Sequence, residues 1–242
     1  MNRAFLLCAA SLLWLIGCRA PLPTYPSMGD REVLAAVAAR QGQVSSVSAE
    51  CELVLTTESG NSVHLDAAVV ILPPGSARLR AWKLGHAVFD VTLVDGKVWV
   101  LSPEAGARGF DPAGIPARAV VDAARLLGPE FYAQAVPGER SGGTLVARGP
   151  AMGSDNVACE IDLRTLVVRA FRAQSDSGVR AGELLLSDYR LVNGIPWPHR
   201  ATLAGVHGGV AARFHSVELN AEVPEDAFTP PSRAKPLEPA AP

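Results

Sequence analysis

The chain has 242 residues, of which 48% are hydrophobic and 19% are charged, and its formal net charge at neutral pH is −2. This length suits one large domain or two small ones and is ample for a hydrophobic core. The sequence has no basic block and no alternation of basic and aromatic residues, which disfavours nucleic-acid binding and electrostatic docking on anionic lipid.

The amino end has the pattern of an export signal. Arg3 precedes an apolar run from Ala4 to Ile16, which closes with Gly17-Cys18. A helix of this run would be about 20 Å long, too short for the roughly 30 Å core of a bilayer. We therefore predict a cleaved signal over residues 1–17 rather than a membrane span. The alternative to a lipid-modified end is an ordinary signal peptide with a chance cysteine.

The end of this run resembles a bacterial lipobox. The resemblance implies that Cys18 receives diacylglycerol and further acyl chains such as palmitate, and becomes the first residue of the mature protein. Several acyl chains together anchor a protein firmly, whereas a single chain binds only marginally. Residues 18–26 contain three prolines and are expected to be an extended tether.

A helix is predicted from Ser27, with Asp30 three residues later as an approximate capping box. Its apolar stripe includes Val33, Leu34 and Val37, and Gly42 should end it. From Val47 the apolar residues alternate with a period of two, which predicts strands with one wet face. The expected strands of this first series begin at Val47 and then cover 64–72, 77–84, 87–94 and 97–101.

Short turns separate these strands, and Asp95-Gly96 is a strong hairpin signal. In the fourth strand Phe89, Val91 and Leu93 should face the core, with Asp90 and Thr92 facing water. Sequential strands with short turns predict an antiparallel meander.

A Gly- and Pro-rich connector over 103–114 leads to a second predicted helix over 115–127, which Gly128-Pro129 should end. A second β series follows, with strands expected at about 131–136, 144–148, 157–163, 167–174, 182–191, 197–204 and 210–219. Residues 232–242 are proline-rich without periodicity and should be a disordered tail.

We therefore predict a single α+β domain over residues 27–231. A dozen twisted strands do not stay flat, so the sheet should be strongly curved, an incomplete β-barrel of about 11–12 strands. The two apolar-striped helices are the elements available to cover its concave face.

Three stretches resemble the LolA/LolB-like family of lipoprotein carriers and receptors. The first is the hairpin around Asp95-Gly96-Lys97, and the second is the strand, Asn193-Gly194 turn and strand that ends in proline. The third is the closing strand 217–220, followed by Phe228 and Pro230-Pro231. The resemblance extends over roughly residues 32 to 231 and implies a curved barrel with helices as a lid over an apolar cavity that takes up acyl chains.

In this family the membrane-anchored member receives lipoproteins from a soluble carrier and places them in the outer membrane. An anchored chain resembles that receptor, and Arg19 after the anchor cysteine, in place of a retaining aspartate, implies the outer membrane. The receptor also uses an exposed apolar side chain on a protruding loop, and the turn at 73–76 contains no large apolar residue. A general lipid- or glycolipid-binding lipoprotein of the same fold is therefore an alternative.

Candidate walls of an acyl-chain cavity are the apolar residues of the first strands and of both helices. They are Val37, Leu53, Leu55, Val69, Ile71, Leu79, Phe89, Val91, Leu93, Val120 and Leu127. Each of these also suits plain core packing. Cys51 and Cys159 lie on the apolar sides of alternating strands, in a compartment that permits disulfides. They form either a disulfide or two separate buried thiols, because the sequence does not show whether their Cα atoms come within about 7 Å.

No catalytic constellation is present in the sequence. There is no Gly-x-Ser-x-Gly elbow and no His-Glu-x-x-His motif. The five histidines lack a third ligand of the kind that a metal site needs and are expected on solvated strand surfaces. We expect no enzyme activity, metal or cofactor.

The sequence thus predicts a lipid-anchored lipoprotein of the cell envelope, in the outer membrane and facing the periplasm. It would bind the acyl chains of lipoprotein or lipid cargo, exchange them with a soluble carrier, and contact no nucleic acid. The alternative is a structural or scaffolding outer-membrane lipoprotein whose own side chains fill the core.

Overall fold

The computed structural model describes residues 20–101, 126–151, 154–174, 180–205 and 208–237. Two helices lie wholly within these residues, α2 (Asp30–Gln41) and α4 (Pro129–Gln134). The strands are β1 (Val47–Thr57), β2 (Ser62–Leu72), β3 (Ser76–Lys83), β4 (His86–Val94), β5 (Lys97–Leu101), β6 (Val136–Ser141), β7 (Thr144–Ala151), β8 (Ser154–Asp162), β9 (Val168–Gln174), β10 (Arg180–Val192), β11 (Ile195–Gly205), β12 (Gly208–Leu219) and β13 (Lys235–Pro236).

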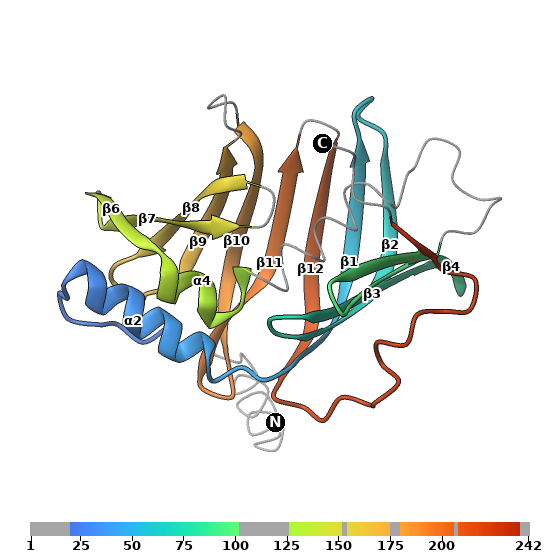
Figure 1. The fold of residues 1–242 in the computed structure, drawn as a ribbon, viewed down its shortest axis with the longest axis horizontal. Helices are drawn as coiled ribbons and strands as arrows, with labels where there is room; N and C mark the ends of the chain where they lie inside the picture. Colours follow the sequence, from blue (N-terminus) through green and yellow to red (C-terminus); the bar gives the residue numbers. More distant parts are fainter. Residues whose placement is uncertain (1–19, 102–125, 152–153, 175–179, 206–207, 238–242) are drawn as a thin grey trace, which may run out of the picture.

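All thirteen strands belong to one sheet, in the order β13-β5-β4-β3-β2-β1-β12-β11-β10-β9-β8-β7-β6. The described neighbours are antiparallel, and the sheet does not close, because β13 and β6 lie at its two ends. Figure 1 shows β11, β12, β1 and β2 upright at the centre, with β3 and β4 crossing at a steep angle, as a strongly twisted sheet requires. The predicted antiparallel, open barrel-like sheet is therefore confirmed, with slightly more strands than expected.

The predicted hairpin turns have the backbone that their residues favour. Asp95 and Gly96 have φ of 51° and 73°, and Asn193 and Gly194 have φ of 51° and 82°. Positive φ at both central residues matches the right-handed twist of the strands on either side, and Asp, Asn and Gly tolerate it best. These local signals fix the β4–β5 and β10–β11 pairings.

Helix α2 begins three residues later than expected. Its N-cap is Gly29, and the Glu32 carboxylate accepts a hydrogen bond from the Gly29 backbone N–H at 2.8 Å. Glu32 and Asp30 also place negative charge in the first turn, where the helix dipole favours it. The predicted end at Gly42 is confirmed, and its N–H donates to the Ala38 carbonyl at 2.9 Å.

Of the strand predicted over 131–136, residues 131–134 belong to helix α4 instead, and Val136 begins strand β6. Pro129 occupies the first turn of α4, where its missing N–H is not needed. Phe131 and Tyr132 are consecutive and both buried, a pattern that a strand facing one core cannot satisfy. Phe131 packs edge-on against Phe171 with ring centroids 5.5 Å apart, so α4 rests on the sheet.

Two hydrophobic clusters divide the interior. One lies under β1–β5, β11 and β12 and includes Leu53, Phe89 and Trp197. The other packs α2 and α4 on β7–β10 and includes Val37 and Phe171. The two described helices therefore lie at the β6–β10 half of the sheet (Figure 1), against the second cluster.

The C-terminal segment covers the outer side of β3 and β4. Arg78 donates two hydrogen bonds from Nε and one from Nη2 to the Asp90 carboxylate, and its Nη1 donates to the Ala227 carbonyl at 2.9 Å. As a result Asp90 and Thr92, which were expected to face water, are buried. The segment then pairs as β13 with Val100 and Trp99 of β5, so the expected disordered tail is paired as far as residue 236.

Several predicted features lie outside the described residues. These are the signal over 1–17, Cys18, Val120, most of the helix at 115–127, and the last residues of the tail. Among the residues that are described, no helix is both long and apolar enough to cross a membrane.

Candidate functional site: an apolar cavity on the inner face of the sheet

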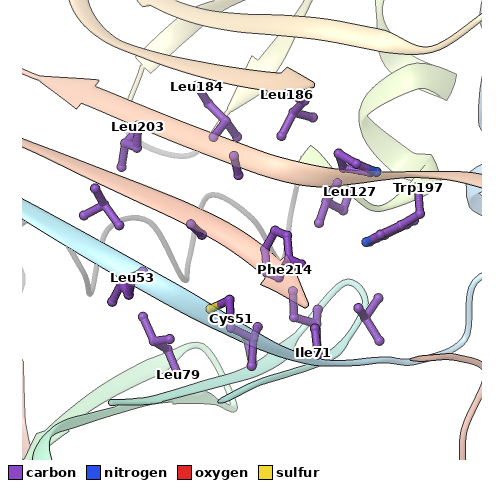
Figure 2. A pocket seen from close by; sticks show the side chains of 18 residues that line it. Cys51, Leu53, Ile71, Leu79, Leu127, Leu184, Leu186, Trp197, Leu203 and Phe214 are labelled. Atoms are coloured by element: carbon purple, nitrogen blue, oxygen red, sulfur yellow. The ribbon is translucent and has the colours of Figure 1, made fainter. Parts of the chain in front are cut away.

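An apolar cavity of about 120 Å³ lies on the inner face of the sheet. Figure 2 shows side chains from β1, β2, β3, β10, β11 and β12 converging on it, together with Leu127. Its lining residues are Val47, Ala49, Cys51, Leu53, Val69, Ile71, Ala77, Leu79, Leu127, Leu184, Leu186, Trp197, Pro198, Ala201, Leu203, Val210, Ala212 and Phe214.

The cavity exists because small side chains face one another across its floor. Leu53 on β1 lies opposite Ala212 on β12, and Ala212 lies opposite Ala201 on β11. Ala201 in turn lies opposite Leu186 on β10. Protein interiors are otherwise close-packed, so two alanines between two leucines leave space that no neighbouring side chain fills.

The chemistry of the wall is almost entirely hydrocarbon. Among the described lining residues, only the Cys51 thiol and the Trp197 indole N–H bring polar side-chain atoms to it. Burial raises the pKa of the Cys51 thiol to about 12, so it stays protonated and is a poor nucleophile at neutral pH. The wall can therefore bind apolar matter by excluding water, at about 0.8 kcal/mol for each CH₂ group buried.

The volume limits what fits without movement. Cavities of ~150 Å³ in proteins bind benzene, whereas pockets for larger ligands run from about 300 Å³ upward. At about 120 Å³ the cavity therefore admits a short section of an acyl chain. A longer section requires the wall to open.

Five of the eleven predicted wall residues line the cavity: Leu53, Val69, Ile71, Leu79 and Leu127. The predicted residues Leu55, Phe89, Val91 and Leu93 are instead packed in the cluster under β1–β5. Val37 faces the other cluster with α2, and Val120 lies outside the described residues.

Sequence reasoning missed the half of the wall that comes from the second β series. Leu184 and Leu186, and likewise Val210, Ala212 and Phe214, recur at alternate positions of their strands. This period of two marks one face of a strand and could have identified them. The face of the sheet that these residues occupy follows only from the pairing of β1 with β12, which joins the first β series to the second.

Cys51 and Cys159 do not form the disulfide that the sequence left open. Both are free thiols and both are buried, Cys51 in the cavity wall and Cys159 in the cluster with the helices. Of the two alternatives, the structure therefore shows two separate thiols.

The histidines that the structure describes are dispersed. His64 is exposed and lies with Nδ1 3.0 Å from Glu52 Oε1, while His86 and His215 are also exposed. His199 is buried, contrary to expectation, with Nδ1 3.2 Å from the Trp197 carbonyl oxygen. Among the described residues, no three His, Cys, Asp or Glu side chains are grouped as metal ligands would be.

Comparisons of the structure with solved structures identify the fold. A LolA superfamily protein from Nitrosomonas europaea aligns with a TM-score of 0.61 over 84% of this chain and 98% of its own, at 10% identity. A putative outer membrane lipoprotein-sorting protein domain from Vibrio parahaemolyticus aligns with a TM-score of 0.60 over 83% and 96%, at 11% identity. A DUF1329 family protein from Desulfovibrio piger aligns with a TM-score of 0.61 over 83% and 98%, at 9% identity.

The chain is thus similar in fold to LolA superfamily and lipoprotein-sorting proteins, and the resemblance found in the sequence is confirmed at the level of fold. No protein-family model and no curated protein matches the sequence.

Proposed function

We propose that this protein is a lipid-anchored lipoprotein that binds acyl chains in its cavity, in lipoprotein or lipid trafficking to the outer membrane. The observation that carries the proposal is the hydrocarbon wall: eighteen lining residues contribute no charged group. A wall of this kind offers an acyl chain hydrophobic burial and no chemistry, so the role is non-covalent binding rather than catalysis. Transfer needs only a recipient site that is more apolar than the donor.

The predicted helix over 115–127 is our candidate for the lid. Its last residue, Leu127, contributes to the cavity wall (Figure 2). Together with α2 and α4 it would cover the concave face, and its displacement would enlarge the cavity enough for a longer section of acyl chain.

Leu84 supports a role in delivery to a membrane. It lies at the turn between β3 and β4, between Lys83 and Gly85, and is 88% exposed. Exposure of so large an apolar side chain at the tip of a hairpin favours insertion into lipid. The resembled receptor uses an exposed apolar residue on a protruding loop. This chain thus has a counterpart one turn later than the turn at 73–76, which contains no large apolar residue.

Attachment to the membrane is assigned to acylation of Cys18, with the folded part facing the periplasm. The proposal expects the full chain carrying Cys18→Ser to leave the membrane as a folded protein. If that variant stayed in the membrane fraction, the attachment would have another origin.

A titration with a fluorescent fatty acid tests the cavity directly. Ala212→Leu places bulk in the gap, whereas Ala211→Leu adds the same atoms to the neighbouring residue on the outer face of β12. We expect Ala212→Leu to weaken probe binding about tenfold or more and Ala211→Leu to leave it unchanged. Equal binding by both variants would contradict the assigned cavity.

The competing function is a scaffolding lipoprotein without a ligand. It predicts that the wild-type chain binds no probe at all and that Ala212→Leu stabilises the protein by filling a void. Probe binding by the wild type excludes it.

A further inference from the structure

Four charged side chains lie in one row on the outer face of the sheet, the face opposite to the cavity. Asp66 on β2 is opposite Glu52 on β1, and Glu52 is opposite Arg213 on β12. Arg213 is opposite Arg200 on β11. Successive side chains alternate between faces. The residues next to the charged row line the cavity on β1, β12 and β11 and are buried in the core on β2, so this charged row points outward.

The order of charges in the charged row is unfavourable within one molecule. Asp66 faces Glu52, and Arg213 faces Arg200, and like charges directly opposite each other destabilise a sheet. Only the central pair of Glu52 and Arg213 has opposite signs. Among the described residues, no carboxylate lies within ion-pair distance of Arg200 or Arg213.

Elsewhere the same sheet pairs its charges. Arg172 on β9 forms ion pairs with both Glu160 on β8 and Glu183 on β10, so that signs alternate from strand to strand. The charged row therefore departs from the alternation of signs that this sheet shows elsewhere. Glu52 in the row is also held in its charged form. The hydrogen bond from His64, followed by the charges of His64, Arg213 and His215, lowers the pKa of Glu52 despite some desolvation.

An apolar row runs beside the charged row on the same face. Val54 on β1 lies opposite Ala211 on β12, which lies opposite Thr202 on β11. Thr202 lies opposite Leu185 on β10, whose side chain is 42% exposed. These side chains are small or apolar and project little from the sheet, so another surface can pack closely against them.

We propose that the outer face of β2, β1, β12 and β11 is the interface of a homodimer. The charged row reads acid, acid, base, base, and turning it end for end gives base, base, acid, acid. A two-fold axis parallel to the strands and between β1 and β12 brings one copy's row onto the reversed row of the other. Arg213 then faces Glu52 of the second copy, and Arg200 faces its Asp66.

The same axis also matches the apolar rows, because it leaves positions along the strands unchanged. Ala211 of one copy faces Val54 of the other. A closed two-fold interface requires a self-complementary surface of this kind. The net charge of −2 adds little general repulsion between copies.

The available area indicates a weak dimer. Four strands spaced about 4.8 Å apart and about 36 Å long present roughly 700 Å², close to the ~800 Å² that each partner buries in a standard interface. Because the outer face of a curved sheet is convex, only part of this area can touch. The association should therefore be weak and sensitive to salt, which screens exposed charges.

Sedimentation velocity on the full chain carrying Cys18→Ser tests the proposal without the acyl anchor. We expect reversible dimers that dissociate as salt is added. Arg200→Glu with Arg213→Glu makes the row wholly acidic, and Asp66→Lys with Glu52→Lys makes it wholly basic. Each double variant should be monomeric, with a Kd at least about tenfold above the wild type.

Mixing the two double variants provides the decisive result. The acidic and basic rows complement each other, so a one-to-one mixture should regain dimers, which unfolded variants could not do. Arg31→Glu with Arg233→Glu changes the net charge as the acidic double variant does, but at exposed positions elsewhere, and should dimerise as the wild type does. A wild-type chain that stays monomeric up to about 1 mM overturns the proposal, and so does a dimer that both reversed variants retain.

Discussion

At the scale of single residues, Gly149 shows how closely α4 is seated on the sheet. A Cβ at this position would lie 2.9 Å from Cε2 of Phe131, nearer than real Cβ contacts allow. Phe131 cannot move away easily, because its ring packs edge-on against Tyr132 and Phe171. The missing side chain of Gly149 is therefore what lets α4 approach β7.

Replacing this glycine should destabilise the protein measurably. We expect Gly149→Ala to lower the free energy of unfolding by about 1–3 kcal/mol, the range for overpacked cores. Urea denaturation followed by circular dichroism measures the change. Gly75→Ala is the matched control, since its Cβ would meet nothing within 4 Å. Equal losses in both variants would show that Phe131 yields without strain.

At the scale of elements, the turn between β8 and β9 is organised by one carboxylate. Asp162 Oδ1 accepts hydrogen bonds from the backbone N–H groups of Arg164 and Thr165 and from the Thr165 hydroxyl, and Oδ2 pairs with Arg169. Burial alone would raise the pKa of Asp162. The hydrogen bonds from Thr165 and Arg164 and the charge of Arg169 outweigh it and hold the pKa below its usual value.

The Asp162 turn should make the free energy of unfolding depend on pH in the acidic range. A carboxyl whose pKa is lower in the folded state stabilises the fold above its unfolded pKa of about 4, and the contribution is lost as the pH falls through the folded value. We expect Asp162→Asn to be less stable than the wild type at neutral pH, and the difference to shrink below about pH 4. Urea midpoints across this range measure it. A constant difference would mean that the charge of Asp162 contributes nothing.

The C-terminal segment depends on the ion pair that it covers. Asp90 is 3% exposed and Arg78 is 21% exposed, and Arg78 also bonds the segment at Ala227. Removing the arginine leaves the buried Asp90 carboxylate to the Thr92 hydroxyl and to the more exposed Arg80, whose Nε is 3.9 Å away. Arg78→Met should therefore lower the free energy of unfolding by about 3 kcal/mol, the low end of the range for a broken buried pair.

Removing both charges separates the cost of an unpaired buried carboxylate from the net contribution of the ion pair to stability. Arg78→Met with Asp90→Leu should recover most of the loss, because well-packed apolar residues often replace a buried pair at little cost. Thermal and urea unfolding of the three proteins provide the comparison. A double variant less stable than Arg78→Met alone would contradict this account of the segment.

The elements that could be predicted are those with local signals. Asp95-Gly96 and Asn193-Gly194 mark hairpins by their backbone preferences, and alternating apolar residues mark the strands on either side. Helix α4 was predicted as a strand because six residues are too few to display a helical period. The burial of Asp90 and the β13–β5 pairing arise from contacts between distant segments, which no local pattern reports.

The same distinction explains the candidate site. Leu53, Ile71 and Leu79 were predictable as inward-facing residues of the first strands. The gap itself depends on which residues lie opposite one another, as Ala201 and Ala212 do on strands paired within the sheet. A void is a property of that register and of missing side-chain volume, so the second half of the wall could not be located from the sequence.

At the scale of the whole molecule, the two faces of the open sheet differ in what covers them and in their chemistry. The inner face combines a packed half under α2 and α4 with a half that contains the apolar cavity. The outer face is covered by the C-terminal segment over β3 and β4 and exposes charges over β2, β1, β12 and β11. This division suits the two proposals, with apolar cargo held on the inner face and a second copy bound on the outer face.

Organic extraction of the purified chain carrying Cys18→Ser, followed by mass spectrometry, tests the central proposal most directly, because any lipid then recovered was bound without the anchor. Parallel extraction of the variant that also carries Ala212→Leu controls for lipid adhering elsewhere. We expect acylated lipid in the first extract and a strong reduction in the second. A first extract free of lipid, or equal amounts in both, would contradict acyl-chain binding in the cavity.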